Sequence, residues 1–191
     1  NDVINLSPGT PMSTGRPLDV AMNDQTVLAV QSAEGDIAYT RRGDLKVSPT
    51  GVLENAEGEL VMGEGGPITV PVGNLITVSP DGTVFAQLPT DPEAAAIAIG
   101  QLMLRDASQT ELVRRTDGLF EPREAALKGQ DFPTGPKPVS VSPGMLEGSN
   151  VNPVATMVKM LDFSRQFEMQ LKLVKETQSI DEAGSTMMRI P

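Results

Sequence analysis

Short apolar runs separated by turn residues fill most of the chain. Between residues 18 and 119 they follow the period of two that is typical of strands, and Gly, Pro, Asp and Asn interrupt them. The pattern predicts strands at Val27–Val30, Ile37–Thr40, Leu45–Val47, Val52–Leu53, Ile68–Val70, Leu75–Val78, Val84–Ala86, Ile97–Leu104, Glu111–Arg115 and Leu119–Phe120. We therefore predict a turn-rich β domain over residues 18–128, and a fold that is mainly β.

Two turns of the same design interrupt this region. Val47-Ser-Pro-Thr-Gly51 and Val78-Ser-Pro-Asp-Gly82 place Pro where a type I turn fixes φ, and Gly where the chain re-enters a strand with positive φ. Each turn predicts the tip of a hairpin. The segment Ala94–Ile99 is ambiguous, because Asp91-Pro-Glu93 could cap a short helix, but the alternation of its apolar residues favours a strand.

A different pattern begins at Pro153. Apolar residues now recur at alternating steps of three and four, which keeps them on one face of a helix made for coiled-coil packing. This seam consists of Met157, Met160, Ser164, Phe167, Leu171 and Val174. A second apolar stripe consists of Val154, Val158 and Leu161. We predict a long amphipathic helix within residues 153–191, with a seam that fades beyond Thr177 and an end or break at Gly184.

The predicted seam needs a partner. Burying its five apolar residues would contribute about 1.5 to 3 kcal/mol each, on the order of 10 kcal/mol in all. Ordering the backbone costs about 1 to 2 kcal/mol per residue before internal hydrogen bonds are counted, so the helix alone would fray. The regular spacing and the Pro-rich segment before the helix favour a helical partner. The alternative is that the seam packs on the β domain of its own chain.

Two segments are expected to be extended connections. Residues 1–17 form a connector rich in Pro and Gly, and residues 129–152 form a linker and turn of similar composition. At the end of the linker, Asn152 suits a helix N-cap and Pro153 suits the first helical position, where its missing N–H would have no partner anyway. The predicted hinge consists of Gly148, Asn150, Asn152 and Pro153.

The composition excludes several kinds of chemistry. The chain has no Cys and no His, so it lacks the residues for cysteine nucleophiles, disulfides, thiolate zinc sites and imidazole catalysis.

A net charge of −10 argues against binding nucleic acid or an anionic membrane. The basic pair Arg41-Arg42 is expected at a solvated edge or against an acidic partner. No apolar run reaches the roughly 18 residues of a transmembrane helix, so no membrane insertion is expected. We predict no enzyme, no cofactor, no metal and no small-molecule substrate.

Five segments together resemble the flagellar basal-body rod and hook family. They are Arg16-Pro-Leu-Asp-Val-Ala21, Tyr39-Thr-Arg-Arg-Gly43, Ser48-Pro-Thr-Gly51, Leu146-Glu-Gly-Ser-Asn-Val-Asn152 and Arg165-Gln-Phe-Glu-Met-Gln170. Each segment alone is a weak signal, but their order makes the set specific, and the resemblance covers nearly the whole chain from Gly15 onward.

The resemblance implies how such a chain assembles. In that family an N-terminal helix pairs with the C-terminal helix to form the inner tube of the rod, and a β domain lies outside. Because the chain starts at Asn1 rather than Met, we expect this N-terminal helical region to be absent ahead of it. The resemblance then implies that the seam faces that helix, that the second stripe faces neighbouring subunits, and that the hinge sets the angle between helix and β domain.

The predicted function is therefore structural. The resemblance implies a subunit of the proximal rod, exported from the cytoplasm through the flagellar type III apparatus, which joins other rod subunits in the periplasmic part of the basal body. One alternative is a distal rod or hook subunit of the same family. Another is a secreted β-rich module that binds glycans, which would need an exposed aromatic platform although Tyr39 is the single Tyr and there is no Trp.

Overall fold

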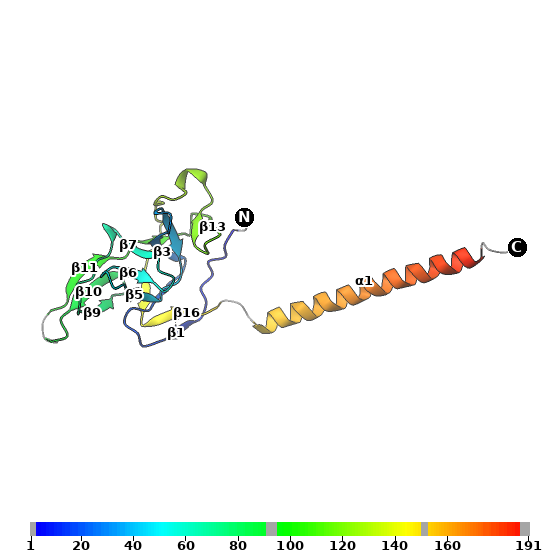
Figure 1. The fold of residues 1–191 in the computed structure, drawn as a ribbon, viewed down its shortest axis with the longest axis horizontal. Helices are drawn as coiled ribbons and strands as arrows, with labels where there is room; N and C mark the ends of the chain where they lie inside the picture. Colours follow the sequence, from blue (N-terminus) through cyan, green and yellow to red (C-terminus); the bar gives the residue numbers. More distant parts are fainter. Residues whose placement is uncertain (1–2, 91–94, 150–152, 188–191) are drawn as a thin grey trace. The chain divides into compact units, whose positions relative to one another are not determined.

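The structure is a computed structural model that describes residues 3–90, 95–149 and 153–187, with helix side chains described for residues 156–177. The chain divides into two compact units: residues 1–150, here called the β unit, and residues 151–191, here called the helical unit (Figure 1). Within the described residues of the helical unit, the helix α1 spans Pro153–Met187. The prediction of a mainly β fold with a long C-terminal helix is confirmed.

The β unit is built from many short strands. They are β1 (Pro11–Ser13), β2 (Val20–Met22), β3 (Thr26–Gln31), β4 (Ile37–Thr40), β5 (Leu45–Val47), β6 (Leu53–Asn55), β7 (Leu60–Gly63), β8 (Gly66–Pro67), β9 (Leu75–Val78), β10 (Thr83–Gln87), β11 (Ile97–Gln101), β12 (Leu104–Asp106), β13 (Leu112–Arg114), β14 (Phe120–Pro122), β15 (Val141–Pro143) and β16 (Met145–Glu147), with a 3-10 helix η1 at Ala125–Leu127. The largest sheet has the order β13-β14-β4-β3-β7-β6-β5, with β12 beside β3 and β8 beside β7. A three-stranded sheet has the order β11-β10-β9, and two further pairs join β1 to β16 and β2 to β15.

Both predicted hairpins are confirmed. β5 pairs with β6 and β9 pairs with β10, in each case antiparallel across the expected turn. The glycines that close the turns, Gly51 and Gly82, have φ values of 78° and 86°, a region that only Gly enters without strain. Local turn chemistry was therefore a sufficient guide to these hairpins.

The central strand β3 separates two apolar cores. Val27 and Ala29 belong to the cluster that contains Tyr39, whereas Leu28 belongs to the cluster that contains Leu45. All five residues are fully buried. A strand buried on both faces is apolar without alternation, which explains why Val27–Val30 reads as a continuous hydrophobic run.

One predicted strand is wrong and two were missed beside it. Ile68–Val70 forms no strand, and its one ladder contact is an isolated bridge between Val52 and Thr69. The strands lie just before it, at β7 and β8, and β7 pairs with both β3 and β6 in the large sheet. The sequence pattern did not predict β7 and β8, because the Gly-rich turn between them leaves only short apolar runs on either side.

The predicted strand Ile97–Leu104 is divided into two. Its first part is β11, which pairs with β10 in the three-stranded sheet. The second part is β12, which pairs with β3 in the large sheet. Leu102 lies between them and forms an isolated bridge to Gly63. The chain thus changes sheets within one apolar run, which periodicity alone does not reveal.

The two predicted connectors are more ordered than expected. The segment 1–17 contains β1, and the segment 129–152 contains β15 and β16. Phe132, with its ring centroid 4.6 Å from that of Tyr39, is buried in the core, as is Val141. The described residues 3–17 and 129–149 therefore belong to the β unit, and their strands were missed because each pairs with a partner far away in the sequence.

The predicted end of the helix at Gly184 is also wrong. α1 continues through this residue to Met187. A single Gly inside a helix costs roughly 1 kcal/mol relative to Ala, which a long helix tolerates. The start of the helix at Pro153 agrees with the prediction.

Asp106, on β12, forms a hydrogen bond to the segment that follows residue 129. Its carboxylate accepts hydrogen bonds from the Ser108 hydroxyl at 2.7 Å and from the Ser108 and Lys137 backbone N–H groups at 3.0 and 2.9 Å. Burial acts to raise the pKa of Asp106, but these hydrogen bonds outweigh it, and the pKa lies below its usual value. The folded protein therefore favours the ionised form.

We expect Asp106→Asn to destabilise the β unit in a pH-dependent way. An amide presents an N–H₂ group to donors, so the variant should lose about 1 to 3 kcal/mol at pH 7. Because the pKa is lowered on folding, this stabilisation is present above the unfolded-state value near about 3.9 and is lost as the pH falls through the folded-state pKa. Urea unfolding followed by the fluorescence of Tyr39, the single Tyr in a chain without Trp, would show the difference shrinking below about pH 4. Asp162→Asn, on the exposed surface of α1, is the control. It should change neither the free energy of unfolding at pH 7 nor its dependence on pH.

Candidate assembly site

The apolar side chains of α1 are exposed. Every side chain that the structure describes in this helix, at residues 156–177, is exposed to solvent. The seam residue Met160 is 67% exposed and Phe167 is 61% exposed, values unusual for large apolar groups. The exposed large apolar residues of α1 are Met157, Val158, Met160, Leu161, Phe163, Phe167, Met169, Leu171, Leu173 and Val174.

The structure places each predicted helix residue as follows. The five apolar seam residues and Ser164 lie on α1 and are exposed, as are Val158 and Leu161 of the second stripe. Val154 lies within α1, but its side chain falls outside the described residues. The helical spacing therefore brings the seam together on one continuous helix.

Three exposed apolar residues were missed by the seam pattern. Phe163 lies three residues after Met160 and four before Phe167, so it flanks the seam and widens it. Met169 and Leu173, four residues apart, lie on another side of the helix. A search for apolar residues at all helical neighbours, rather than for alternating steps alone, would have found Phe163. α1 is consequently apolar on more than one face.

The predicted hinge is described only in part. Asn150 and Asn152 lie outside the described residues, and Pro153 is the first residue of α1. Gly148 donates its N–H to the Thr10 carbonyl at 3.0 Å, and a Cβ at this position would lie 2.9 Å from the same oxygen. Gly148 is therefore required for close pairing of the two end segments of the β unit.

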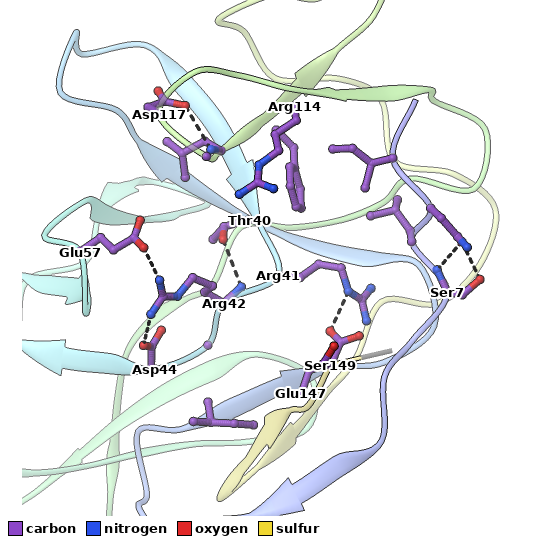
Figure 2. Close-up of a pocket in the computed structure, with 18 of the residues that line it drawn as sticks. Ser7, Thr40, Arg41, Arg42, Asp44, Glu57, Arg114, Asp117, Glu147 and Ser149 are labelled. Atoms are coloured by element: carbon purple, nitrogen blue, oxygen red, sulfur yellow. Dashed lines mark hydrogen bonds and ion pairs between the residues drawn. The ribbon is translucent and has the colours of Figure 1, made fainter. Parts of the chain in front are cut away.

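A partly buried ion pair, Arg41 with Glu147, joins these end segments to the sheet (Figure 2). The Nε of Arg41 donates to a Glu147 carboxylate oxygen at 2.8 Å, and both side chains are at most 15% exposed. The other Glu147 oxygen accepts the N–H of Gly9 at 2.7 Å. The guanidinium also donates to the main-chain carbonyls of Met22, Asp24 and Thr26. The expectation that Arg41 lies at a solvated edge or against an acidic partner chain is thus wrong, because its acidic partner is within the chain.

The next residue, Arg42, has a different environment. It is half exposed and pairs with Asp44 at 2.9 Å and with Glu57. These residues line an open groove of about 960 Å³ between the segment 3–7, the loop after β4, the β13–β14 hairpin and the end of β16 (Figure 2). The charges of Arg41 and Arg42 on its wall are taken up by carboxylates of the same chain, so they are not free to bind a charged ligand.

Three of the five family-like segments contact one another within the β unit. Arg16 lies 3.6 Å from Asp19 and donates to the carbonyl of Leu45, and the Asp19 carbonyl accepts the Gly144 N–H at 2.7 Å. At Gly43 a Cβ would lie 1.7 Å from the Val20 carbonyl, so no other residue fits. Arg16, Gly43 and Glu147 come from three separate segments, and each makes a contact between distant parts of the β unit.

A compact β unit with an exposed apolar helix is typical of a protein that assembles with other chains, because large exposed apolar surface marks an interaction site. Among the residues that the structure describes, no helix is long and apolar enough to cross a bilayer. The exposed apolar face of α1 is therefore a candidate surface for binding other protein chains.

Comparison with known proteins identifies the family. Residues 21–86 match the model of the flagellar hook protein FlgE/F/G D1 domain, and residues 142–187 match that of the flagellar basal body rod FlgEFG protein C-terminal region. The flagellar basal-body rod protein FlgF of Salmonella typhimurium is 43% identical over 179 residues, 93% of this chain and 69% of the relative. FlgF of Escherichia coli K12 is 42% identical over 181 residues, 94% of this chain and 70% of the relative. A FlgG from Buchnera aphidicola is 30% identical over 175 residues, 88% of this chain and 64% of the relative.

The chain belongs to the FlgF family of flagellar basal-body rod proteins. The resemblance to rod and hook proteins that the five sequence segments indicated is confirmed.

Proposed function

We propose that this chain is a structural subunit of the proximal rod of the bacterial flagellum, and that it assembles through α1. The observation that carries the proposal is the exposed apolar surface of α1, in a chain that is 43% identical to a flagellar basal-body rod protein over nearly its whole length. The role is mechanical rather than catalytic, and it serves flagellum-dependent motility.

The free energy available to the seam supports assembly through the helix. Met157, Met160, Phe167, Leu171 and Val174 are 48 to 67% exposed, so most of their apolar surface is still in contact with water. Complete burial would contribute about 1.5 to 3 kcal/mol for each residue. An isolated helix is marginal in water, and most helical stability comes from packing an apolar face. The seam is thus the part of α1 that gains most from a second helix.

The width of the apolar surface supports contacts on several sides. In a two-stranded coiled coil the positions that flank the seam are often Glu or Lys, whereas here Leu161 and Phe163 occupy them. Met169 and Leu173 add apolar surface elsewhere on the helix. Because exposed apolar groups lie on more than one side of α1, more than one neighbour packs against it in the rod.

We assign a different neighbour to each surface. The seam packs against the N-terminal helix that the rod and hook family contributes, and the second stripe of Val154, Val158 and Leu161 faces neighbouring subunits. The hinge, from Gly148 to Pro153, sets the direction in which α1 leaves the β unit. Repeating one such heterologous contact from subunit to subunit builds a helical tube.

The cellular setting follows from the family. The chain leaves the cytoplasm through the flagellar type III export apparatus and joins proximal and distal rod subunits in the periplasmic rod. Nucleic acid, membrane insertion, cofactors and small-molecule substrates have no part in this role. The glycan-binding alternative is disfavoured because Tyr39 is fully buried and its hydroxyl is engaged by Asp131 at 3.0 Å.

Locating the chain in isolated basal bodies tests the proposal. We expect a strain without its own FlgF to swim again when it expresses the full-length gene with an epitope tag. The tag should be labelled at the proximal end of the rod. Rods purified from a mutant that forms no hook should still carry the label. Label confined to the hook or to the distal rod would instead favour the other axial subunits.

A further inference from the structure

Two exposed methionines lie side by side in the seam of α1. Met157 and Met160 are 64% and 67% exposed, and residues three apart in a helix are neighbours on one face. They are the most exposed methionines among those whose side chains the structure describes. Met22 and Met103, in contrast, are buried in the β unit and are 2% and 6% exposed. A small oxidant in the surrounding water therefore reaches the two seam side chains but not the two core ones.

The thioether of methionine reacts with hydrogen peroxide without any other reagent. A sulfur lone pair attacks one peroxide oxygen, so that an S–O bond forms and the O–O bond breaks. The departing hydroxide takes the proton from the transferred OH group and leaves as water. The sulfur is thereby oxidised to a sulfoxide while the peroxide is reduced, and an apolar side chain becomes a polar, chiral one.

A sulfoxide in the seam opposes the packing for which the seam is suited. Its oxygen is a hydrogen-bond acceptor, and burying such a group among apolar side chains without a donor is unfavourable. The other large residues of the seam, Phe167, Leu171 and Val174, have no donor in their side chains. Leucine at positions 157 and 160 would supply similar apolar surface without sulfur. The two methionines therefore make the seam sensitive to oxidation in a way that its other residues do not.

We propose that Met157 and Met160 are an oxidation site through which hydrogen peroxide keeps a modified subunit out of the rod. This rests on the proposed function, because it requires that the seam packs against another helix. The free chain exposes both methionines, whereas packing of the seam covers them, so the free chain is the sensitive form. Enzymes that reduce methionine sulfoxide restore the thioether, which makes the block reversible.

Oxidation of the purified full chain tests the site itself. After treatment with hydrogen peroxide, peptide mass spectrometry measures the fraction of each methionine that has gained one oxygen atom. We expect Met157 and Met160 to be oxidised at least about tenfold faster than Met22 and Met103. The near-ultraviolet circular dichroism of Tyr39 verifies that the β unit stays folded during the reaction. Equal rates at the seam and core positions of the folded chain would overturn the proposal, whatever the chain does in the cell.

Cells test whether oxidation of the seam blocks assembly. The full-length gene is induced in a strain without its own FlgF, and rods are counted by electron microscopy with and without hydrogen peroxide. Each version is compared with itself in the absence of peroxide, which cancels any direct effect of its substitutions. We expect peroxide to reduce the rods of the unaltered chain by about tenfold, and to reduce those of Met157→Leu with Met160→Leu much less. Met12→Leu with Met169→Leu removes two methionines outside the seam that are 58% and 59% exposed, and this matched control should stay sensitive.

A measurement on the unaltered chain makes the test independent of these substitutions. Basal bodies and unassembled chain are isolated from the peroxide-treated cells, and the sulfoxide fraction at Met157 and Met160 should be at least about tenfold lower in the basal bodies. Equal sulfoxide in the two preparations, or equal sensitivity of the three versions to peroxide, would overturn the oxidation site and leave the rod function intact. A chain that is absent from basal bodies even without peroxide would instead refute the proposed rod function, and the block with it.

Discussion

Cells whose rod subunit carries Phe167→Asp and Leu171→Asp are expected to assemble no functional rod and to be non-motile. The two residues are 61% and 48% exposed on α1 and lie one helical turn apart in the seam. Replacing both removes about 3 to 6 kcal/mol of apolar burial on assembly, which corresponds to a loss of roughly a hundredfold to ten-thousandfold in the association constant. Two carboxylates would also have to be buried, at further cost. Swimming in soft agar and counts of rods by electron microscopy measure the effect.

The helix offers a matched control for this pair. Gln166→Asp and Gln170→Asp introduce the same two charges at the same spacing, one residue earlier along α1, on exposed polar positions. We expect this control to retain rods and motility. Circular dichroism should show equal helix content in both variants, so that a difference reports packing rather than helix formation. If the seam variant swims as well as the control, assembly through the seam is refuted.

Arg41→Met should lower the melting temperature of the β unit by about 6 to 12 °C. The substitution removes the Arg41 partner of the Glu147 carboxylate, which is 15% exposed and still accepts the N–H of Gly9, and it removes donors from three carbonyls. Breaking a buried pair in this way costs about 3 to 5 kcal/mol, and we take the lower end because Glu147 keeps some contact with water. For a chain of this size each kcal/mol shifts the melting temperature by about 2 to 4 °C. Near-ultraviolet circular dichroism of Tyr39 reports the β unit alone, since α1 contains no Tyr.

The neighbouring arginine provides the comparison. Arg42→Met removes the same charge from the same loop, but Arg42 is 51% exposed, and exposed ion pairs contribute under about 1 kcal/mol. Its melting temperature should therefore change by no more than about 2 to 4 °C. Arg41→Lys should be intermediate, because it keeps the charge and loses the planar fork that reaches several carbonyls. Equal effects of Arg41→Met and Arg42→Met would contradict the role given to the buried pair.

Features set by neighbouring residues could be predicted from the sequence. The turns ending at Gly51 and Gly82 depend on local φ preferences, and the start of α1 at Pro153 depends on the missing N–H of proline. By contrast, β16 pairs with β1, which lies more than a hundred residues earlier. Its sequence of Met, Leu and Glu carries no strong pattern, and the pairing becomes favourable only when the rest of the β unit brings the two strands together.

The same distinction holds for the candidate assembly site. Helical spacing was enough to find the exposed seam, because residues such as Met160 and Phe167 share a face through local geometry. It did not find the role of Arg41, whose partner Glu147 is 106 residues away. A basic pair followed by Gly is typical of a surface turn, and only the folded β unit shows that Arg41 is largely shielded from solvent by its partners.

The pairing of β1 with β16 determines how the β unit responds to a pulling force. Pro11 is opposite Glu147 and Ser13 is opposite Met145, so the incoming and outgoing chains lie at the same end of an antiparallel ladder. Tension that separates the two strands acts on the hydrogen bonds of the ladder one after another, beginning with the bond from the Gly148 N–H to the Thr10 carbonyl. The Arg41–Glu147 pair lies at this end, so it opposes separation of the two strands where that separation would begin.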